Sequence, residues 1–423
     1  MDEEKISLLD ENIAKIKEDV SSGNEFPEEL LEIVNYSPEQ AIILGHNQPD
    51  PDCIAMSAAM RHILRQNDID SKIFYTGEVN NYMNKQLFTD LDLRNNLLFR
   101  VNDIVSSNKR SDLEDALKAI RHTVILDTQS PELQVNFFKY MNPKTFIDHH
   151  AHSNGSDSKD QDDVFNLVIP SGAGTSILLD YMRQKDYDLS ASELSTLRIL
   201  SYLGMKTDTN NFHRKRMTGL DHTALEYLIG FMNDDDYKSV EKISDPKLPP
   251  SVMGELGKAL SFSSKNVYGG KVVIYPVPEI IESDTDTSLV PYLADELFER
   301  KKHLGADAVI VYGMVATESG KEKNVKVIAS GRSIDSTIDV RTIFEEAFYS
   351  WKMEDESQDD DNIPIYSKKL SSGGRKTPEG ATVAGATVSH PEYNQHVVLE
   401  NIWPEISSMY KKRILEASGI KEE

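Results

Sequence analysis

Short apolar runs alternate with amphipathic segments along the first half of the chain. Between about residues 41 and 203, runs rich in β-branched and aromatic residues are separated by stretches with the apolar spacing of helices. This alternation predicts βαβ units and therefore a mostly parallel sheet. The expected strands are AIILG at 41–45, KIFYT at 72–76, LLFRV at 97–101, TVILD at 123–127 and TFID at 145–148.

A second α/β pattern begins near residue 271, after a stretch with few apolar residues and three prolines. Because 423 residues exceed what one core usually supports, we expect two domains. The predicted fold class is α/β, with a mostly parallel sheet in the first domain and a second, smaller α/β domain. The expected parts are an N-terminal helical extension at 1–34, the first domain at 35–235, a linker at 236–265, the second domain at 266–395 and a C-terminal helix at 396–423.

The N-terminal segment MDEEKISLLDENIAKIKEDV has the apolar spacing of an amphipathic helix and is acidic where a secretory signal would be basic. We expect this helix to pack on the first domain, and a homodimer contact is the alternative. No apolar run approaches the roughly 20 residues that cross a bilayer. The single cysteine, Cys53, excludes an intramolecular disulfide framework and thiolate metal clusters. These features predict a cytoplasmic protein without a membrane span.

The formal charge of -24 argues against a surface that coats long nucleic acids, because such surfaces neutralise phosphates with lysine and arginine. A local basic cleft remains compatible with this charge. The segment 353–362, MEDESQDDDN, contains six acids and no base and is predicted to be a surface loop.

Polar side chains follow the ends of three expected strands. The stretch GHNQPDPDC at 45–53 follows the first strand, and taken alone it is better explained as a helix start capped by Asp52. Three further segments change that interpretation, because the carboxyl ends of parallel strands meet at one edge of a sheet. Together the segments supply His46, Asp50, Asp52, Asp127, Asp148, His149, His150 and, after a later helix, Asp208.

Carboxylate and imidazole groups are the ligands that Mn²⁺ and Mg²⁺ accept in proteins, together with water. A pair of ions about 3.5 to 4 Å apart requires a carboxylate that bridges them. The inventory is sufficient for two private ligands on each ion and one shared aspartate, and two such cations acidify a shared water for attack on phosphorus.

The four segments resemble, in order and spacing, the four motifs of the DHH phosphoesterase superfamily, over roughly residues 41 to 235. The later segment resembles the DHH-associated C-terminal domain, which folds over the catalytic cleft. The resemblance implies that His46 and Asp50 bind one metal ion. Asp52, His149 and Asp208 would bind the other, and Asp127 would bridge both. The implied cofactors are two divalent ions, Mn²⁺ foremost, with Mg²⁺ or Co²⁺ as alternatives.

The same resemblance implies catalytic roles for His150 and Asp148. His150 would contact the scissile phosphate and help to protonate the leaving oxygen, and Asp148 would accept a hydrogen bond from a ligand imidazole. The segment SGAGTS at 171–176 resembles a small-residue helix start whose backbone N–H groups face a phosphate or a metal-bound ligand. Ordinary close packing of a helix start explains it equally well.

Two glycine-containing segments in the second domain resemble substrate-binding segments of the associated domain. They contain arginines able to hold phosphate in bidentate fashion, and glycines that let a ligand approach the backbone. Arg375 stands where the family normally has a histidine, which leaves the identity of the substrate open. The candidate substrate contacts are Arg332, Ser333, Gly373, Gly374 and Arg375.

The leading hypothesis is a Mn²⁺-dependent phosphodiesterase or phosphatase acting on short oligonucleotides or on linear or cyclic dinucleotides, so its partner is a short nucleic acid or a nucleotide. A RecJ-like single-strand exonuclease is the first alternative, but it requires a basic, aromatic-lined channel that is not visible in the sequence. An inorganic pyrophosphatase or polyphosphatase would use the same metals with more basic residues. A non-catalytic scaffold is the non-enzymatic alternative, and the presence of all six proposed ligands argues against it.

Overall fold

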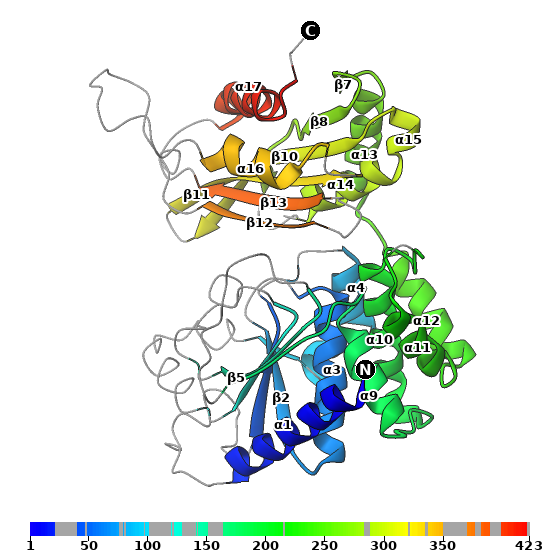
Figure 1. Cartoon of the computed structure of the whole chain (residues 1–423). Coiled ribbons are helices and arrows are strands. Elements are labelled where there is room, and N and C mark those ends of the chain that lie inside the picture. The colour runs from blue at the N-terminus through cyan, green and yellow to red at the C-terminus, as the bar shows by residue number, and fades with distance from the viewer. Residues whose placement is uncertain are drawn as a thin grey trace. The chain divides into compact units, whose positions relative to one another are not determined.

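The protein folds as two compact units, seen in a computed structural model (Figure 1). The first comprises Met1–Val79 with Met83–Pro246, and the second comprises Asn80–Tyr82 with Lys247–Glu423. The structure describes residues 1–21, 40–46, 49–75, 79, 82–96, 98–100, 120, 122–128, 141, 143–150, 164–214, 216–282, 288–319, 322–334, 337–349, 370–376, 382–389 and 399–420. The acidic segment 353–362 lies outside these residues.

The first unit is built on a six-stranded sheet in which every described strand pair is parallel, as the alternation of strands and helices predicts. The strand order is β3-β2-β1-β4-β5-β6. The strands are β1 (Gln40–Leu44), β2 (Asp70–Tyr75), β3 (Leu98–Arg100), β4 (Thr123–Leu126), β5 (Pro143–Asp148) and β6 (Phe165–Val168). The strand β6 was not predicted, because only one of its four residues is buried.

Helices cover this sheet and share one apolar core with it. The described helices of the unit are α1 (Glu3–Ser21), α3 (Pro51–Gln66), α4 (Tyr82–Asp90), α5 (Leu93–Asn96), α9 (Thr175–Gln184), the 3₁₀ turn η2 (Ser192–Leu194), α10 (Ser195–Asp208), α11 (Gly219–Ile229) and α12 (Asp234–Ser244). Helix α1 buries Leu9, Ile13, Ile16 and Val20 in this core. The N-terminal helix therefore packs on the first unit.

The chain reverses its direction across the sheet between β1 and β4. From β1 the chain proceeds to β2 and β3 on one side, and from β4 it proceeds to β5 and β6 on the other. Strands β1 and β4 are hydrogen-bonded neighbours with Leu44 opposite Ile125. In parallel sheets, ligands bind outside the carboxyl ends of the strands at such a switch point. The residues that follow β1 and β4 are therefore the first place to look for a site.

The second unit contains a seven-stranded mixed sheet of order β12-β13-β11-β10-β8-β7, with β9 paired to β10. Its strands are β7 (Val267–Tyr268), β8 (Val272–Pro276), β9 (Ile281–Glu282), β10 (Ala308–Ser319), β11 (Glu322–Ser333), β12 (Leu370–Lys376) and β13 (Thr382–Ser389). Its described helices are α13 (Pro250–Ser263), α14 (Leu289–Glu299), α15 (Lys301–Leu304), α16 (Val340–Tyr349) and α17 (Leu399–Ala417). The fold class is thus α/β, as expected.

The two faces of this sheet are covered differently. The central strands β8 and β10 place alternate residues in two cores, one on the side of α16 and α17 and one on the side of α13 and α14. Strand β13 buries Ala384, Ala386 and Val388 in the first of these cores, while Val383 and Gly385 on its other face are partly exposed. The sheet therefore has an accessible surface at the β13 end of the α14 side.

Two segments differ from the sequence-based expectation. The stretch 236–265, expected to be a linker, lies mainly in α12 and α13, and the two units divide within it after Pro246. Helix α12 begins with a capping box at Asn233 and buries the apolar residues Val240 and Ile243. Strands β12 and β13 are rich in glycine and alanine and were not predicted as strands. In the described part of the chain, no helix combines the length and the apolar character needed to cross a membrane.

Candidate metal centre

Asp127 directly follows β4 and is shared between two histidines. Its Oδ1 lies 3.4 Å from Nε2 of His149, and its Oδ2 lies 3.6 Å from Nε2 of His46. Its backbone has a left-handed φ of 56°, an uncommon conformation for a residue other than glycine, and its N–H donates to the carbonyl of Ile147 at 3.0 Å. The two oxygens of one buried carboxylate thus face two separate imidazoles.

His46 and Asp50 form one side of the cluster. Asp50 is the N-cap of α3, where its Oδ1 accepts a hydrogen bond from the N–H of Cys53 at 3.0 Å, and Pro51 occupies the first turn of that helix. Its other oxygen lies 3.8 Å from Nε2 of His46. Burial lowers the pKa of His46, but the carboxylates of Asp127 and Asp50 outweigh burial and raise it to about 9. The surroundings of this imidazole therefore favour a positive charge.

His149 forms the other side, and its two ring nitrogens have different partners. Nδ1 lies 3.0 Å from the carbonyl oxygen of Ser171, so Nδ1 carries a proton and Nε2 is the nitrogen that can offer a lone pair to a metal ion. That Nε2 is buried without a hydrogen-bond partner. Three carboxylate oxygens lie around it, from Asp208 at 3.3 Å, Asp127 at 3.4 Å and Asp52 at 3.8 Å. A buried ring nitrogen without a hydrogen-bond partner and three carboxylate oxygens that converge on it are the donors of a cation site.

Asp52 is fully buried and binds the start of α9 rather than the start of its own helix α3. Its carboxylate accepts hydrogen bonds from the N–H of Gly174 at 2.7 Å and of Thr175 at 3.1 Å. A Cβ on Gly204 of α10 would lie 3.1 Å from Oδ1 of Asp52, so that glycine allows α10 to approach. Burial raises the pKa of Asp52, and the charges of Asp208 and Asp127 raise it further. A divalent cation would relieve this repulsion.

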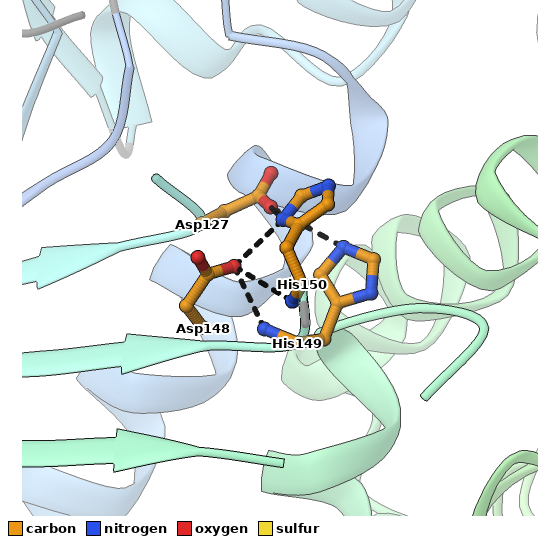
Figure 2. Close-up of side chains that lie close together, drawn as sticks. All are labelled: Asp127, Asp148, His149 and His150. Atoms are coloured by element: carbon orange, nitrogen blue, oxygen red, sulfur yellow. Dashed lines mark hydrogen bonds and ion pairs between the residues drawn. The ribbon is translucent and has the colours of Figure 1, made fainter. Parts of the chain in front are cut away.

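Asp148 orients His150 at the end of β5, as Figure 2 shows. The Nδ1–H of His150 donates to Oδ1 of Asp148 at 2.7 Å, and the same oxygen accepts from the backbone N–H groups of His149 and His150. The imidazole that Asp148 holds is therefore that of His150, whereas His149 is held by the Ser171 carbonyl. The ring of His150 is partly exposed beside Asp127.

The donor set fits two hard or borderline divalent ions. Among the described residues, three groups of side chains have ligand atoms within 4.8 Å of one another: His46, Cys53 and Asp127; Asp52, His149 and Asp208; and Asp127, Asp148, His149 and His150. Cys53 is the only sulfur donor among them. Burial, followed by the charges of Asp127 and Asp50, raises the pKa of its thiol, so it remains a protonated packing residue. The remaining donors are oxygen and imidazole nitrogen, which suit Mn²⁺, Mg²⁺ or Co²⁺.

The candidate substrate contacts in the second unit are not all brought together. Arg332 and Arg375 are both paired with Val383, from opposite sides of β13, and Gly373 and Gly374 lie next to Arg375 on β12. The Nε of Arg332 donates to Asp295 of α14 at 2.7 Å. Ser333 is buried instead, and its hydroxyl is hydrogen-bonded to that of Thr382 at 2.7 Å. The side chain of Arg375 lies outside what the structure describes.

Two groups near the cluster were not expected from the sequence. One is the Ser171 carbonyl, which has no side-chain signature. The other is Asp221, which binds the N–H groups of Gly172 and Ala173 at 2.8 Å and 3.2 Å. With Asp52 on the next two N–H groups, the whole 172–175 turn is held by carboxylates. Its amides therefore face protein oxygens rather than open space. The pattern Thr218-x-x-Asp221 is typical of a capping box, which is the one sequence signal available for Asp221.

The first unit is thus a doubly wound parallel sheet with a buried histidine and carboxylate cluster around one shared aspartate. Residues 40–205 match the model of the DHH family, N-terminal domain. This match assigns residues 40–205 to the N-terminal domain of the DHH family, in agreement with the resemblance that the motifs suggested.

Relatives were found both by sequence and by structure. An uncharacterized protein of Methanocaldococcus jannaschii is 26% identical over 387 residues, which cover 90% of this chain and 65% of that protein. The chain thus spans slightly under two thirds of this curated relative. An exopolyphosphatase-related protein from Bacteroides fragilis has the same fold, with a TM-score of 0.55, 13% identity, and coverage of 93% of this chain and 96% of that one. RecJ from Thermus thermophilus in complex with Mn²⁺ gives a TM-score of 0.39 at 10% identity, covering 96% of this chain and 54% of that one.

Proposed function

We propose that the protein is a Mn²⁺-dependent phosphodiesterase or phosphatase that hydrolyses phosphoester bonds in short oligonucleotides or in linear or cyclic dinucleotides. The observation that carries the proposal is the shared Asp127 carboxylate, whose two oxygens face His46 and His149 separately. A pair of neighbouring ions requires a carboxylate that both ions can share. A carboxylate that lies between two imidazoles is in the position to provide this shared ligand.

In this proposal, the ligands divide into two groups. His46 and Asp50 hold one ion, Asp52, His149 and Asp208 hold the other, and Asp127 is common to both. When bound, the ions supply Lewis acidity toward a phosphoryl oxygen and toward water. The protein contributes fixed positions, because Asp50 is held as a helix cap, Asp52 by two backbone N–H groups and His149 by the Ser171 carbonyl.

His150 is the proposed acid. Its Nδ1 is occupied by Asp148, so Nε2 is the nitrogen available for a substrate oxygen. As an imidazolium, Nε2–H donates to the phosphate and passes its proton to the leaving oxygen, while the Asp148 carboxylate stabilises the positive ring. We assign Asp148 to orienting this ring rather than to binding metal.

The accessible surface on β13 is the proposed substrate platform of the second unit. Arg332 and Arg375 are both opposite Val383, and residues directly opposite each other on neighbouring strands share one face of the sheet. Their backbones are therefore two strand spacings apart, about 10 Å. Asp295 and the hydroxyl of Ser330 hold the guanidinium of Arg332 in place. Two arginines at backbone positions on either side of Val383 suit a ligand with more than one phosphate.

A substrate panel tests the activity. The metal-free full chain is supplied with Mn²⁺, Mg²⁺ or Co²⁺ and incubated with short and long single-stranded oligonucleotides, linear and cyclic dinucleotides, 3'-phosphoadenosine 5'-phosphate, pyrophosphate and polyphosphate. We expect release of nucleotide from the short substrates with Mn²⁺. Preferential degradation of long single strands would favour the RecJ-like alternative. Hydrolysis of pyrophosphate or polyphosphate alone would favour the alternative that the Bacteroides fragilis neighbour suggests. No turnover of any substrate would overturn the enzymatic proposal.

Arg332→Ala tests the platform. Loss of one phosphate contact should raise KM about 10- to 100-fold, in keeping with the strength of a charge-assisted hydrogen bond, while the bound metal content stays that of the wild type. Asp295→Asn, which leaves the guanidinium but removes its charged partner, should raise KM less. Loss of metal from Arg332→Ala would contradict the assignment.

A further inference from the structure

One peptide unit connects His149 of the candidate metal centre to the carboxylate of Asp221. The carbonyl oxygen of Ser171 lies 3.0 Å from Nδ1 of His149, and the N–H of Gly172 donates to Oδ2 of Asp221 at 2.8 Å. These C=O and N–H groups belong to the same planar amide. The position of Asp221 therefore fixes the acceptor of the His149 ring.

Asp221 is a rigid anion in this structure. It is fully buried, and its two oxygens accept from five neutral donors, which leaves its charge without a cationic partner among the described residues. The donors are the N–H groups of Gly172 and Ala173, the hydroxyl of Ser176, and the N–H and hydroxyl of Thr218, at distances of 2.6 to 3.2 Å.

The turn at Gly172 has no room for a side chain. A Cβ at this residue would lie 2.3 Å from the carbonyl oxygen of Arg216, and 2.9 Å from both Asp221 and the methyl group of Thr209. Thr209 directly follows the proposed ligand Asp208. The same peptide unit is thus enclosed by the start of α11 and by the segment that carries Asp208.

We propose that Asp221 is a positioning residue for His149 and acts on it through the Ser171–Gly172 peptide unit. The carboxylate polarises the amide from its N–H end, which makes the carbonyl a stronger acceptor for Nδ1–H. The stronger hydrogen bond fixes the tautomer and increases electron density on Nε2, the nitrogen that faces the metal site. The inference rests on the proposed function, because it assumes that His149 binds metal.

Asp221→Asn tests the inference with Mn²⁺ as the probe. All five partners donate, so an asparagine amide cannot accept from the donors that its NH₂ group faces. Titration calorimetry on the metal-free full chain should show about a 10- to 100-fold loss of Mn²⁺ affinity at one site. Asp236→Asn is the matched control, because Asp236 is a buried carboxylate at the same position of the α12 capping box and is bonded to Arg198 and Ser195, away from His149. The control should bind Mn²⁺ within twofold of the wild type.

The outcomes separate the two proposals. If the wild type binds no Mn²⁺, the proposed function fails. If the wild type binds Mn²⁺ and a folded Asp221→Asn variant binds it equally well, only the role of Asp221 is overturned. An affinity loss shared equally by Asp236→Asn would also overturn it, because that result would reflect general destabilisation.

A spectroscopic readout decides the question even if Asp221→Asn does not fold. Nitrogen-15 NMR of the Mg²⁺-loaded protein should find the His149 proton on Nδ1. In Thr218→Ala, which removes one donor from Asp221, the resonance of that proton should shift while the ring of His122 keeps its wild-type signals. A proton on Nε2 of His149, or a Nδ1–H resonance that Thr218→Ala leaves unchanged, would contradict the proposed connection.

Discussion

Strands β4 and β5 have a cluster of histidine and carboxylate groups at each end. At the amino ends lie His122, just before β4, and Thr145 of β5, together with Asp19 from α1. There His122 uses both ring nitrogens, Nδ1 at 2.8 Å from Asp19 and Nε2 at 2.8 Å from the hydroxyl of Thr145. Lys144 also binds Asp19, at 3.0 Å. At the carboxyl ends, by contrast, Nε2 of His149 has no hydrogen-bond partner.

The difference distinguishes a structural cluster from a ligand site made of the same residue types. Burial lowers the pKa of His122, and the carboxylate of Asp19 only partly opposes this. Burial also acts to lower the pKa of His149, but Asp127 and Asp208 outweigh it and raise the pKa well above its ordinary value. Satisfied hydrogen bonds join α1 to the sheet at one end. At the other end, a buried ring nitrogen without a hydrogen-bond partner and the carboxylates that converge on it form the candidate cation site.

The largest difference between the two clusters is expected for their aspartates. Asp127→Asn removes the shared charge and should lower kcat by at least about a thousandfold, with reduced occupancy of both ions. Asp19→Asn should leave kcat within twofold of the wild type. The measurements are steady-state kinetics on the best substrate of the panel and metal content after dialysis. Retained turnover in Asp127→Asn would show that another residue is shared between the ions.

The two histidines should separate metal affinity from stability. His149→Gln should weaken Mn²⁺ binding at one site by about 100-fold or more, since it removes a ligand outright. His122→Gln should bind Mn²⁺ normally but lower the free energy of unfolding of the first unit by about 1–3 kcal/mol, because buried partners lose their hydrogen bonds. Calorimetric titration and urea unfolding followed by far-UV circular dichroism distinguish these effects. Equal loss of Mn²⁺ affinity in both variants would show that the two clusters do not differ in their role in metal binding.

The affinity for Mn²⁺ should rise with pH. In the metal-free protein the pKa of His46 is about 9, above the ordinary 6.5, so at neutral pH a proton must leave before this ligand binds. Between about pH 6.5 and 9, the release of one proton strengthens binding by about tenfold for each pH unit. Titrations in two buffers with different ionisation enthalpies count the protons released. Binding that is independent of pH in this window would argue against His46 as a ligand.

The smallest expected effect is a pH dependence of stability at the amino-end cluster. Because the pKa of His122 is lower in the folded chain than in the unfolded chain, the unfolded chain takes up a proton first as the pH falls below about 6.5. The contribution of His122 to stability is therefore present above this pH and decreases in acid. The free energy of unfolding of His122→Gln, measured with urea, should therefore lie closer to the wild-type value at about pH 5.5 than at about pH 7.5.

Much of the fold and of the clustering of histidines and carboxylates could be predicted, because local patterns carried the information. The apolar strands of the first sheet end directly in His46, Asp127 and Asp148, and parallel strands bring their carboxyl ends to one edge. The sheet of the second unit was less predictable at β12 and β13, whose small residues pack mainly through one face. Sequence patterns favour strands with large alternating side chains, and these strands have few.

The groups that hold the candidate metal ligands in place were harder to predict, because they lie far from those ligands in the sequence. Asp52 could be interpreted as a cap for the helix that contains it, yet it binds N–H groups 122 and 123 residues away. The acceptor for His149 is a backbone carbonyl, which any residue provides. Asp221 belongs to a capping box, which is a local sequence signal. The capping box explains the presence of Asp221 by itself, so the sequence gives no reason to connect this residue with the site. Each of these contacts follows from tertiary packing rather than from a motif.

The backbone at Asp127 has a consequence for evolution and engineering. A left-handed φ of 56° is a conformation that glycine adopts without strain, so glycine, which cannot bind metal, would relieve the backbone strain at the end of β4. Asp127→Gly is therefore expected to unfold at a higher temperature than Asp127→Ala, although neither has a carboxylate. Relief of backbone strain would draw position 127 toward glycine, whereas the proposed chemistry requires a carboxylate there, so the two demands act in opposite directions.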